Sequence, residues 1–81
     1  MSYFMYVLKS RKDGSLFKGI TRDIGLRLKH HNAGKHMTTK HKLPLEVVYI
    51  EMYTTYLEAH KRKKFFTSEA GSIVLERLLD T

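Results

Sequence analysis

Residues 3–20 read YFMYVLKSRKDGSLFKGI. This stretch opens with aromatic and aliphatic residues of the kind that favour a β-strand. The dipeptide Asp13-Gly14 is then a strong signal for a tight turn, after which residues 16–20 return as a second strand. The stretch therefore predicts an antiparallel hairpin.

The register of that hairpin determines which side chains share a face. Successive side chains along a strand point to opposite faces, so one residue more or less in the turn exchanges the faces. Tyr6 and Phe17 fall on one face if Asp13-Gly14 is a two-residue turn, and on opposite faces if the loop has three residues. The sequence is compatible with both registers.

The segment after the hairpin has the signals of a helix followed by a basic loop. Residues 21–23 supply helix-start chemistry, and residues 24–32 carry a helical pattern. Gly34 is well placed to end the helix with a positive φ angle. Residues 33–44 then form a basic loop that closes at Pro44.

The remaining chain predicts one more strand and two more helices. Residues 45–52 are β-branched and aromatic enough for a third strand. Thr54 or Thr55 can cap a second helix, and residues 72–79 can form a short amphipathic helix after Gly71. The order of elements is ββαβα with a further C-terminal helix, which is an α+β arrangement.

Length and composition limit the class of protein. With 81 residues, of which 42% are hydrophobic and none is cysteine, the chain is expected to form a single domain over residues 1–81 without a disulfide. No stretch approaches the roughly 18 apolar residues of a membrane span, and the N-terminal residues lack the pattern of a leader. We therefore expect a soluble, cytoplasmic protein with no membrane partner.

Positive charge is concentrated in the middle of the chain. The sequence has 15 Lys and Arg against 8 Asp and Glu, a net charge of +7, and between Lys18 and Lys42 lie seven basic residues, four histidines and a single acid, Asp23. Such a block favours a polyanion, because binding releases the counterions of its phosphates. A solvated surface that keeps a small protein soluble is the alternative that charge alone leaves open.

Both predicted sheet-packing helices place a cation among apolar residues. At about 100° per residue, each helix has one stripe that should pack on the sheet and that includes a basic side chain. The stripe of the first helix consists of Ile24, Arg27, Leu28 and His31, and that of the second of Tyr56, Ala59, Lys63 and Phe66. A functional placement is one interpretation of Arg27 and Lys63, and snorkelling at the rim of the core is the other.

Taken in order, these motifs show that the chain resembles the GIY-YIG nuclease domains, in particular the small stand-alone bacterial ones. The resemblance covers residues 3–67, and its five motif segments follow one another at the right spacing. They are MYVLKS (5–10), LFKGIT (16–21), RL with HNAGK (27–28 and 31–35), PL with VVY (44–45 and 47–49), and EA with Arg62 (58–59).

The resemblance implies a three-stranded antiparallel sheet flanked by helices, and hydrolysis of a phosphodiester bond assisted by one divalent metal ion. It assigns to Tyr6 a phenol that can hydrogen-bond or relay a proton near the attacking water. Arg27 matches the arginine that would stabilise charge on the phosphate oxygens. His31 matches the family's histidine, four residues later on the same helix face.

Three positions depart from the family pattern. Phe17 replaces the second motif's tyrosine, a candidate general base in many members, and a phenyl ring cannot accept a proton. Lys63 replaces the acid of the second helix, and its ammonium would repel Mg²⁺ or Mn²⁺. Thr67 stands where the family has a lysine. The resemblance therefore predicts that the fold is kept while the chemistry is impaired.

We expect a domain that binds nucleic acid, with DNA as the first candidate and RNA as the alternative, and with little or no metal-dependent cutting. The family active-site positions are Tyr6, Phe17, Arg27, His31 and Lys63, and the residues expected to contact nucleic acid are Arg27, Lys35, Lys40, Lys42, Lys61 and Arg62. One alternative is an active endonuclease that uses Mg²⁺ or Mn²⁺ and recruits a ligand such as Glu69. The other is a module whose basic face binds an acidic protein.

The five histidines do not predict a metal site. His30, His31, His36 and His41 lie in no recognised zinc spacing, and no cysteine completes a tetrahedral set. Contact with phosphates or with water is the interpretation we favour for His36 and His41.

Overall fold

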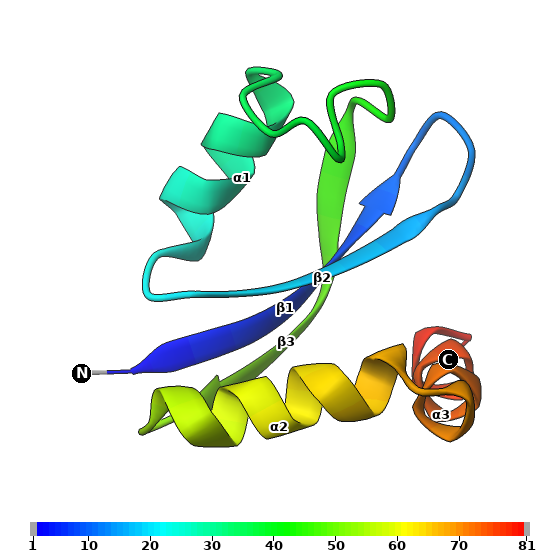
Figure 1. Ribbon diagram of the computed structural model, residues 1–81. Coiled ribbons are helices and arrows are strands. Elements are labelled where there is room, and N and C mark those ends of the chain that lie inside the picture. Colours follow the sequence, from blue (N-terminus) through cyan, green and yellow to red (C-terminus); the bar gives the residue numbers. More distant parts are fainter. Residues whose placement is uncertain (1, 81) are drawn as a thin grey trace.

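The computed structural model describes residues 2–80 and shows an α+β fold (Figure 1). The strands are β1 (Tyr3–Ser10), β2 (Leu16–Thr21) and β3 (Leu45–Tyr53), and the helices are α1 (Ile24–Asn32), α2 (Tyr56–Thr67) and α3 (Glu69–Leu79). This is the order of elements that the sequence predicts. No helix within the described range is long and apolar enough to cross a membrane.

The three strands form an antiparallel sheet in the order β2-β1-β3, so that β1 is central. In the hairpin, Tyr6 lies opposite Gly19 and Leu8 lies opposite Phe17. Directly opposed residues share a face of the sheet, and so do residues two apart on a strand. Tyr6 and Phe17 therefore lie on one face, which settles the register that the sequence left open.

The turn that gives this register is longer than the two-residue turn considered above. The amide of Ser10 donates to the carbonyl of Ser15 at 2.8 Å, and the amide of Gly14 donates to the carbonyl of Ser10 at 2.9 Å. Residues 11–14 thus make the turn, with Gly14 at a φ of +79° that suits glycine. Because the turn is longer by an even number of residues, the faces are not exchanged.

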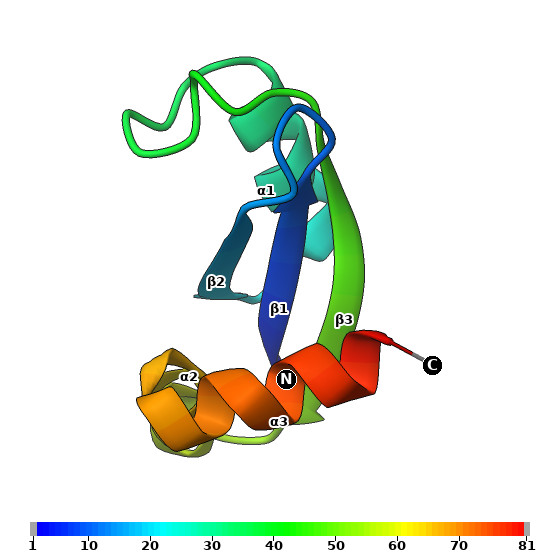
Figure 2. The same ribbon diagram turned by 90° about the vertical axis from the view of Figure 1, so that its right-hand side faces the viewer.

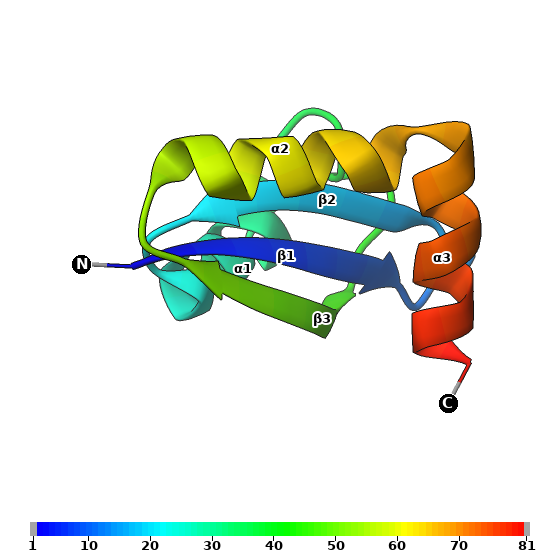
Figure 3. The same ribbon diagram turned by 90° about the horizontal axis from the view of Figure 1, so that it is seen from below.

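The helices cover the sheet from both sides (Figures 1 and 3). One face packs on α2 and α3 around the buried residues Met5, Val7, Ala59, Phe66 and Leu75. The other face packs on α1 and the loop before β3 around the buried residues Tyr6, Leu8 and Leu45, with Phe17, Ile24 and Leu28 partly buried against them. We call these the α2 face and the α1 face. Burial of apolar side chains on both faces stabilises the sheet.

The ends of α1 and α2 follow the capping chemistry of the sequence. The side chain of Asp23 accepts a hydrogen bond from the amide of Leu26 at 3.0 Å, and Gly34 follows α1 at a φ of +76°. Thr55, one of the two expected caps, precedes α2 and accepts from the amide of Glu58 at 3.2 Å. The Glu58 carboxylate in turn accepts from the Thr55 hydroxyl at 2.9 Å.

The prediction for the last helix was wrong at its start. α3 begins at Glu69, where Ser68 caps it by accepting from the amide of Gly71 at 3.1 Å. Gly71 is buried inside the helix, and a Cβ at this position would overlap the main-chain carbonyl of Phe65 at the end of α2. The glycine that resembled a helix boundary instead lies inside α3, where it lets the backbone of α3 pass close to the end of α2.

A side chain at the end of α1 fixes the start of β3. The side-chain nitrogen Nδ2 of Asn32 donates to the main-chain carbonyl of Leu45 at 3.0 Å. In return, the main-chain amide of Leu45 donates to the side-chain oxygen Oδ1 of Asn32 at 2.8 Å. This pair of hydrogen bonds holds together the two ends of residues 33–44, which we call the basic loop.

Candidate nucleic-acid interface

Tyr6 lies at the centre of the α1 face. Its side chain is 5% exposed and packs in one buried cluster with Leu8 and Leu45. Gly19 leaves the space that the Tyr6 ring occupies, because a Cβ there would overlap the ring and its hydroxyl. Phe17 packs against the same cluster. The two motif positions are therefore neighbours, but Phe17 contributes packing and no proton acceptor.

Arg27 extends from α1 near Tyr6. Burial raises the pKa of the Tyr6 phenol above its ordinary value of 10.0, and the positive charge of Arg27 lowers it in part. The phenol therefore stays protonated at neutral pH, where it can donate a hydrogen bond. Together, Tyr6 and Arg27 offer donors to a phosphate oxygen.

His31 is buried and holds the basic loop. Its Nδ1 shares a hydrogen bond of 2.8 Å with the hydroxyl of Thr39, and its ring stacks on that of His36 with centroids 4.0 Å apart. Burial lowers the pKa of the His31 imidazole, and the neighbouring charges of His36, Arg27 and His30 lower it further. A neutral, buried imidazole with a protein partner anchors the loop and does not present a free ring to a ligand.

Lys63 belongs to the other layer of the molecule. α2 packs on the α2 face through Ala59 and Phe66, which cluster with Met5, and the partly buried Lys63 lies on the same stripe of that helix. The other four family positions lie on the α1 face or on α1 itself. The structure thus brings four of the five positions together and places the fifth on a helix that covers the opposite face.

The side chains at the family positions do not fit a divalent metal ion. Mg²⁺ and Mn²⁺ prefer carboxylate and other hard oxygen ligands, and the position of the family's acid carries the ammonium of Lys63. Within residues 2–80, no group of three or more histidines and acids is arranged to hold a metal. Glu69, the ligand considered for an active enzyme, is the exposed first residue of α3, beyond the C-terminal end of α2.

Arg62, expected to contact nucleic acid, is engaged within the protein. Its Nε donates to Glu51 at 2.8 Å, and its guanidinium lies 4.5 Å from the ring centroid of Phe66. Glu51 also accepts from the hydroxyls of Tyr49 at 2.6 Å and Tyr53 at 2.7 Å. Burial raises the pKa of Glu51, but these hydrogen bonds outweigh it and the net shift is downward. This network joins β3 to α2, and in it the positive charge of Arg62 is paired with the carboxylate of Glu51.

The lysines expected to contact nucleic acid differ in whether they form ion pairs within the protein. Lys42 forms an ion pair with Asp13 of the hairpin turn, and its carbonyl accepts from the buried hydroxyl of Ser10 at 2.7 Å. In contrast, three exposed lysines form no ion pair with any residue of the described range. They are Lys35, Lys40 and Lys61.

A pocket that the sequence did not predict lies beside Arg27. It has a volume of about 350 Å³ and opens where the end of β2, the start of α1 and the start of α2 meet. Its lining consists of Tyr3, Ile20, Thr21, Arg22, Asp23, Arg27 and Tyr56. The one signal available in the sequence was the position of Tyr56, an aromatic residue at the start of a helix stripe, where it remains 54% exposed.

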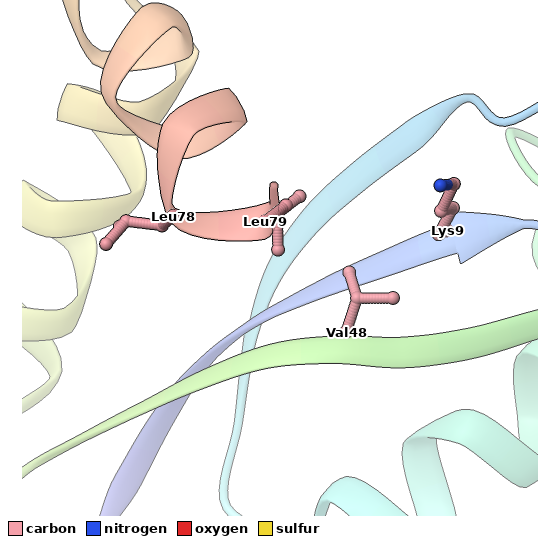
Figure 4. Close-up of a pocket in the computed structure, with 4 residues that line it drawn as sticks. All are labelled: Lys9, Val48, Leu78 and Leu79. Carbon is pink, nitrogen blue, oxygen red and sulfur yellow. The ribbon is translucent and has the colours of Figure 1, made fainter. Parts of the chain in front are cut away.

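A second pocket, of about 280 Å³, lies on the α2 face near the end of α3 (Figure 4). Leu78 and Leu79 line it from α3, and Val48 and Lys9 line it from the sheet. None of these residues belongs to the family positions. The pocket beside Arg27 is therefore the one that adjoins them.

Comparison with known proteins agrees with this geometry. A family model described as the GIY-YIG catalytic domain matches residues 2–72. UPF0213 proteins of Staphylococcus aureus strains Mu50 and N315 are 43% identical over 63 residues, which is 76% of this chain and 76% of each relative. The solution NMR structure of a UPF0213 protein from Bacillus halodurans is similar with a TM-score of 0.58 and 27% identity, and the match covers 96% of this chain and 85% of that one. The chain is accordingly a member of the GIY-YIG family.

Proposed function

We propose that this protein binds nucleic acid, with DNA as the first candidate and RNA as the alternative, and that its capacity to cut phosphodiester bonds is impaired. The observation that carries the proposal is the pair Phe17 and Lys63, which occupy the family's phenol and carboxylate positions on an otherwise retained fold. The proposal has two parts, a binding surface and a loss of chemistry, and each has its own support.

Support for binding comes from the run of positive charge along α1 and the basic loop. α1 has no acid in its first turn and carries the exposed Lys29 in its last turn. Lys35 and Lys40 follow it on the exposed surface of the loop. Phosphate groups bind such a surface without regard to sequence, and release of their counterions makes the affinity fall with salt.

Support for impaired cutting comes from the chemistry of the side chains. Phe17 has no oxygen with which to take a proton, and the buried phenol of Tyr6 has a raised pKa that keeps its own proton in place. Lys63 would repel the cation that the family's acid would bind. A phosphodiester held by Arg27 would thus meet neither an activated water nor a metal ion.

The test is a salt titration of binding combined with a cleavage assay. Fluorescence anisotropy with a short duplex DNA, between about 50 and 200 mM salt, should show weak binding that falls steeply with salt. Lys40→Ala should lower the logarithmic slope by about one, as expected for one lost phosphate contact. Arg77→Ala is the matched control, because it removes one exposed charge from α3, far from the basic loop (Figure 2).

Two results would contradict the proposal. Undetectable binding at low salt, or binding that does not respond to salt, would favour a protein-interaction module. Nicking of plasmid DNA that requires Mg²⁺ in the unmodified protein would show that the family's chemistry is retained.

A further inference from the structure

The pocket beside Arg27 combines flat aromatic side chains with cations, the two features that a nucleotide requires of a protein. We propose that it binds one unpaired nucleotide of a nucleic-acid strand, with the base against Tyr56 and Tyr3 and the phosphate at Arg27 and Arg22. This inference rests on the proposed function, since it names the kind of nucleic acid that the same surface binds.

Planar groups of Tyr3, Tyr56 and Arg22 line the pocket, and the ring of His60 lies next to them outside it. The ring of Tyr56 packs edge-on against that of Tyr3, with centroids 5.9 Å apart at 78°, and lies nearly parallel to the ring of His60 at 5.9 Å. The guanidinium of Arg22 lies 5.0 Å from the centroid of the Tyr3 ring. Tyrosine rings and arginine planes are the surfaces on which proteins stack exposed bases. Since more than half of Tyr56 is exposed, its ring is accessible to a base.

The charges of the pocket favour an anion. Arg22 and Arg27 line it together with one acid, Asp23. One carboxylate oxygen of Asp23 is engaged in capping α1, since it accepts a hydrogen bond from the main-chain amide of Leu26 at 3.0 Å. Two guanidinium groups against one capping carboxylate leave a positive pocket, and the forked donors of arginine suit phosphate oxygens.

The size and position of the pocket also suit a nucleotide. A volume of about 350 Å³ lies at the lower end of the range found for small-ligand sites. α1 leads from the pocket to the basic loop and, with its nine residues, spans about 13 Å. A strand with one nucleotide in the pocket could therefore continue along α1 to Lys35 and Lys40, which lie exposed just beyond the helix.

These features favour an unpaired nucleotide over a base pair. In a duplex both faces of a base are covered by its neighbours, so a stacking ring gains access to bases in single strands, loops and ends. A surface that bound phosphates alone would not require Tyr56 beside the two arginines. The tyrosine thus makes binding depend on the base as well as on charge.

The experiment compares two strands of equal charge, one with bases and one without. The probes are a thymidine oligonucleotide of about twelve nucleotides, within the usual range of single-strand site sizes, and an abasic strand of the same length. The intact protein should bind the thymidine strand roughly tenfold more tightly, because stacking of a base on an aromatic ring is lost in the abasic strand. Parallel titrations with a uridine strand and with a duplex compare the affinities for RNA and for paired DNA with those for the two DNA strands.

Variants of Tyr56 test whether this aromatic residue causes the tighter binding of the thymidine strand. Tyr56→Ala should abolish the preference for bases while the abasic strand binds as before. Tyr56→Phe retains the ring and should retain the preference. Leu57→Ala, at the next and equally exposed position of α2 outside the pocket, is the matched control and should change neither affinity. Urea denaturation of each variant shows whether it is folded. If Tyr56→Ala does not fold, Arg22→Ala is the second test, and it should weaken binding of both strands because it removes a cation from the phosphate side of the pocket.

The outcomes separate this inference from the proposed function. If both strands bind equally and Tyr56→Ala changes nothing, the protein binds phosphates and the pocket has no base-binding role. If neither strand nor duplex binds, both proposals are wrong. A tighter affinity for the duplex than for the thymidine strand would likewise overturn the preference for an unpaired nucleotide.

Discussion

Two arginines show how the same residue type acquires different roles. Both Arg27 and Arg62 were expected from the sequence to contact nucleic acid. Arg27 lies on the predicted inner stripe of α1 and reaches a pocket, whereas Arg62 pairs with Glu51 and packs on Phe66. The helix period predicted the direction of Arg27. It could not predict the partner of Arg62, because Glu51 lies on a strand whose position beside α2 is set by tertiary packing.

The two arginines should respond oppositely to truncation. Arg27→Ala should weaken binding to DNA while stability changes by less than about 0.5 kcal/mol, as is usual for a surface substitution. Arg62→Ala should lower the free energy of unfolding by about 1–3 kcal/mol, because it leaves the Glu51 carboxylate without its cation. Urea denaturation and DNA anisotropy on both variants check this. A loss of several kcal/mol in Arg27→Ala with binding intact would make Arg27 a structural residue.

His31 should make stability depend on pH. Its pKa is lowered in the folded protein from an ordinary value of 6.5, so the unfolded chain binds the proton more readily. The contribution is therefore fully present above pH 6.5 and is lost as the pH falls from there toward the lowered value. Between about pH 7.5 and 5, the free energy of unfolding should fall more steeply in the parent protein than in His31→Gln.

The control for that titration is His41→Gln, which removes an exposed histidine of the same basic loop. Its pH profile shows the effect of removing a histidine that is not buried. Equal pH profiles for the parent and for His31→Gln, measured by urea denaturation, would show that burial of His31 has no energetic consequence. The range stays above pH 5 because Glu51, whose pKa is lowered from 4.5, contributes its own dependence at lower pH.

At the scale of elements, local signals predicted helix ends well where the residue at the end acts on its own helix. Asp23 was one of three residues expected at the start of α1, Thr55 was one of two expected to cap α2, and Gly34 was expected to end α1. Such capping depends only on the chain within a few residues. Gly71 was misjudged for the opposite reason. Glycine also permits two helices to approach, and that use depends on a neighbour that the local sequence does not reveal.

Gly71 and Gly25 both lie within helices, and they differ in how much space surrounds the position of an added Cβ. Gly71→Ala should destabilise the protein by about 2 kcal/mol or more, because the added Cβ would overlap the Phe65 carbonyl and push α3 from α2. Gly25→Ala should be neutral or stabilising by up to about 1 kcal/mol, since the nearest atom to a Cβ there is Asp23 Oδ1 at 3.6 Å and alanine favours a helix. Thermal and urea denaturation of both variants measure the difference. Equal stabilities would mean that α2 and α3 are not packed at Gly71.

At the scale of the whole molecule, the order of strands and helices was predictable, but the meeting of distant segments was not. Tyr3 and Tyr56 lie far apart in the sequence and meet because α2 starts beside the beginning of the central strand β1 (Figure 3). The sequence also gave no means of placing Lys63 relative to Tyr6. Periodicity identifies the inner stripe of a helix, but it does not identify the face of the sheet on which that helix packs.

Restoring the family's side chains tests whether the layers still form one active site. Lys63→Glu should create a weak Mn²⁺ site, because it exchanges a repelling ammonium for a hard oxygen ligand. Paramagnetic broadening of NMR signals should reveal this site and show whether it reaches Gly19 and Tyr6. Phe17→Tyr alone should do little, because it adds a phenol without a metal ion. Since α2 covers the face opposite Phe17, Mn²⁺-dependent nicking by the double variant beyond the two single effects would show that both positions act on one phosphodiester, and the absence of such a gain would show that they are separate. The parent is assayed first under the same conditions. Cutting by the parent that Lys63→Glu leaves unchanged would mean that the acid was never needed.

The hydrogen bonds between Asn32 and Leu45 have a consequence for protein engineering. They close the basic loop at its base and hold the end of α1 beside the start of β3. Lengthening a loop whose ends are already held is inexpensive in entropy, with a doubling in length costing about 0.6 kcal/mol. An insertion between the exposed residues Met37 and Thr38 would also leave the buried Thr39 with its hydrogen bond to His31. This point of the loop is therefore a natural place to graft a foreign recognition peptide, and the sheet beneath would serve as its scaffold.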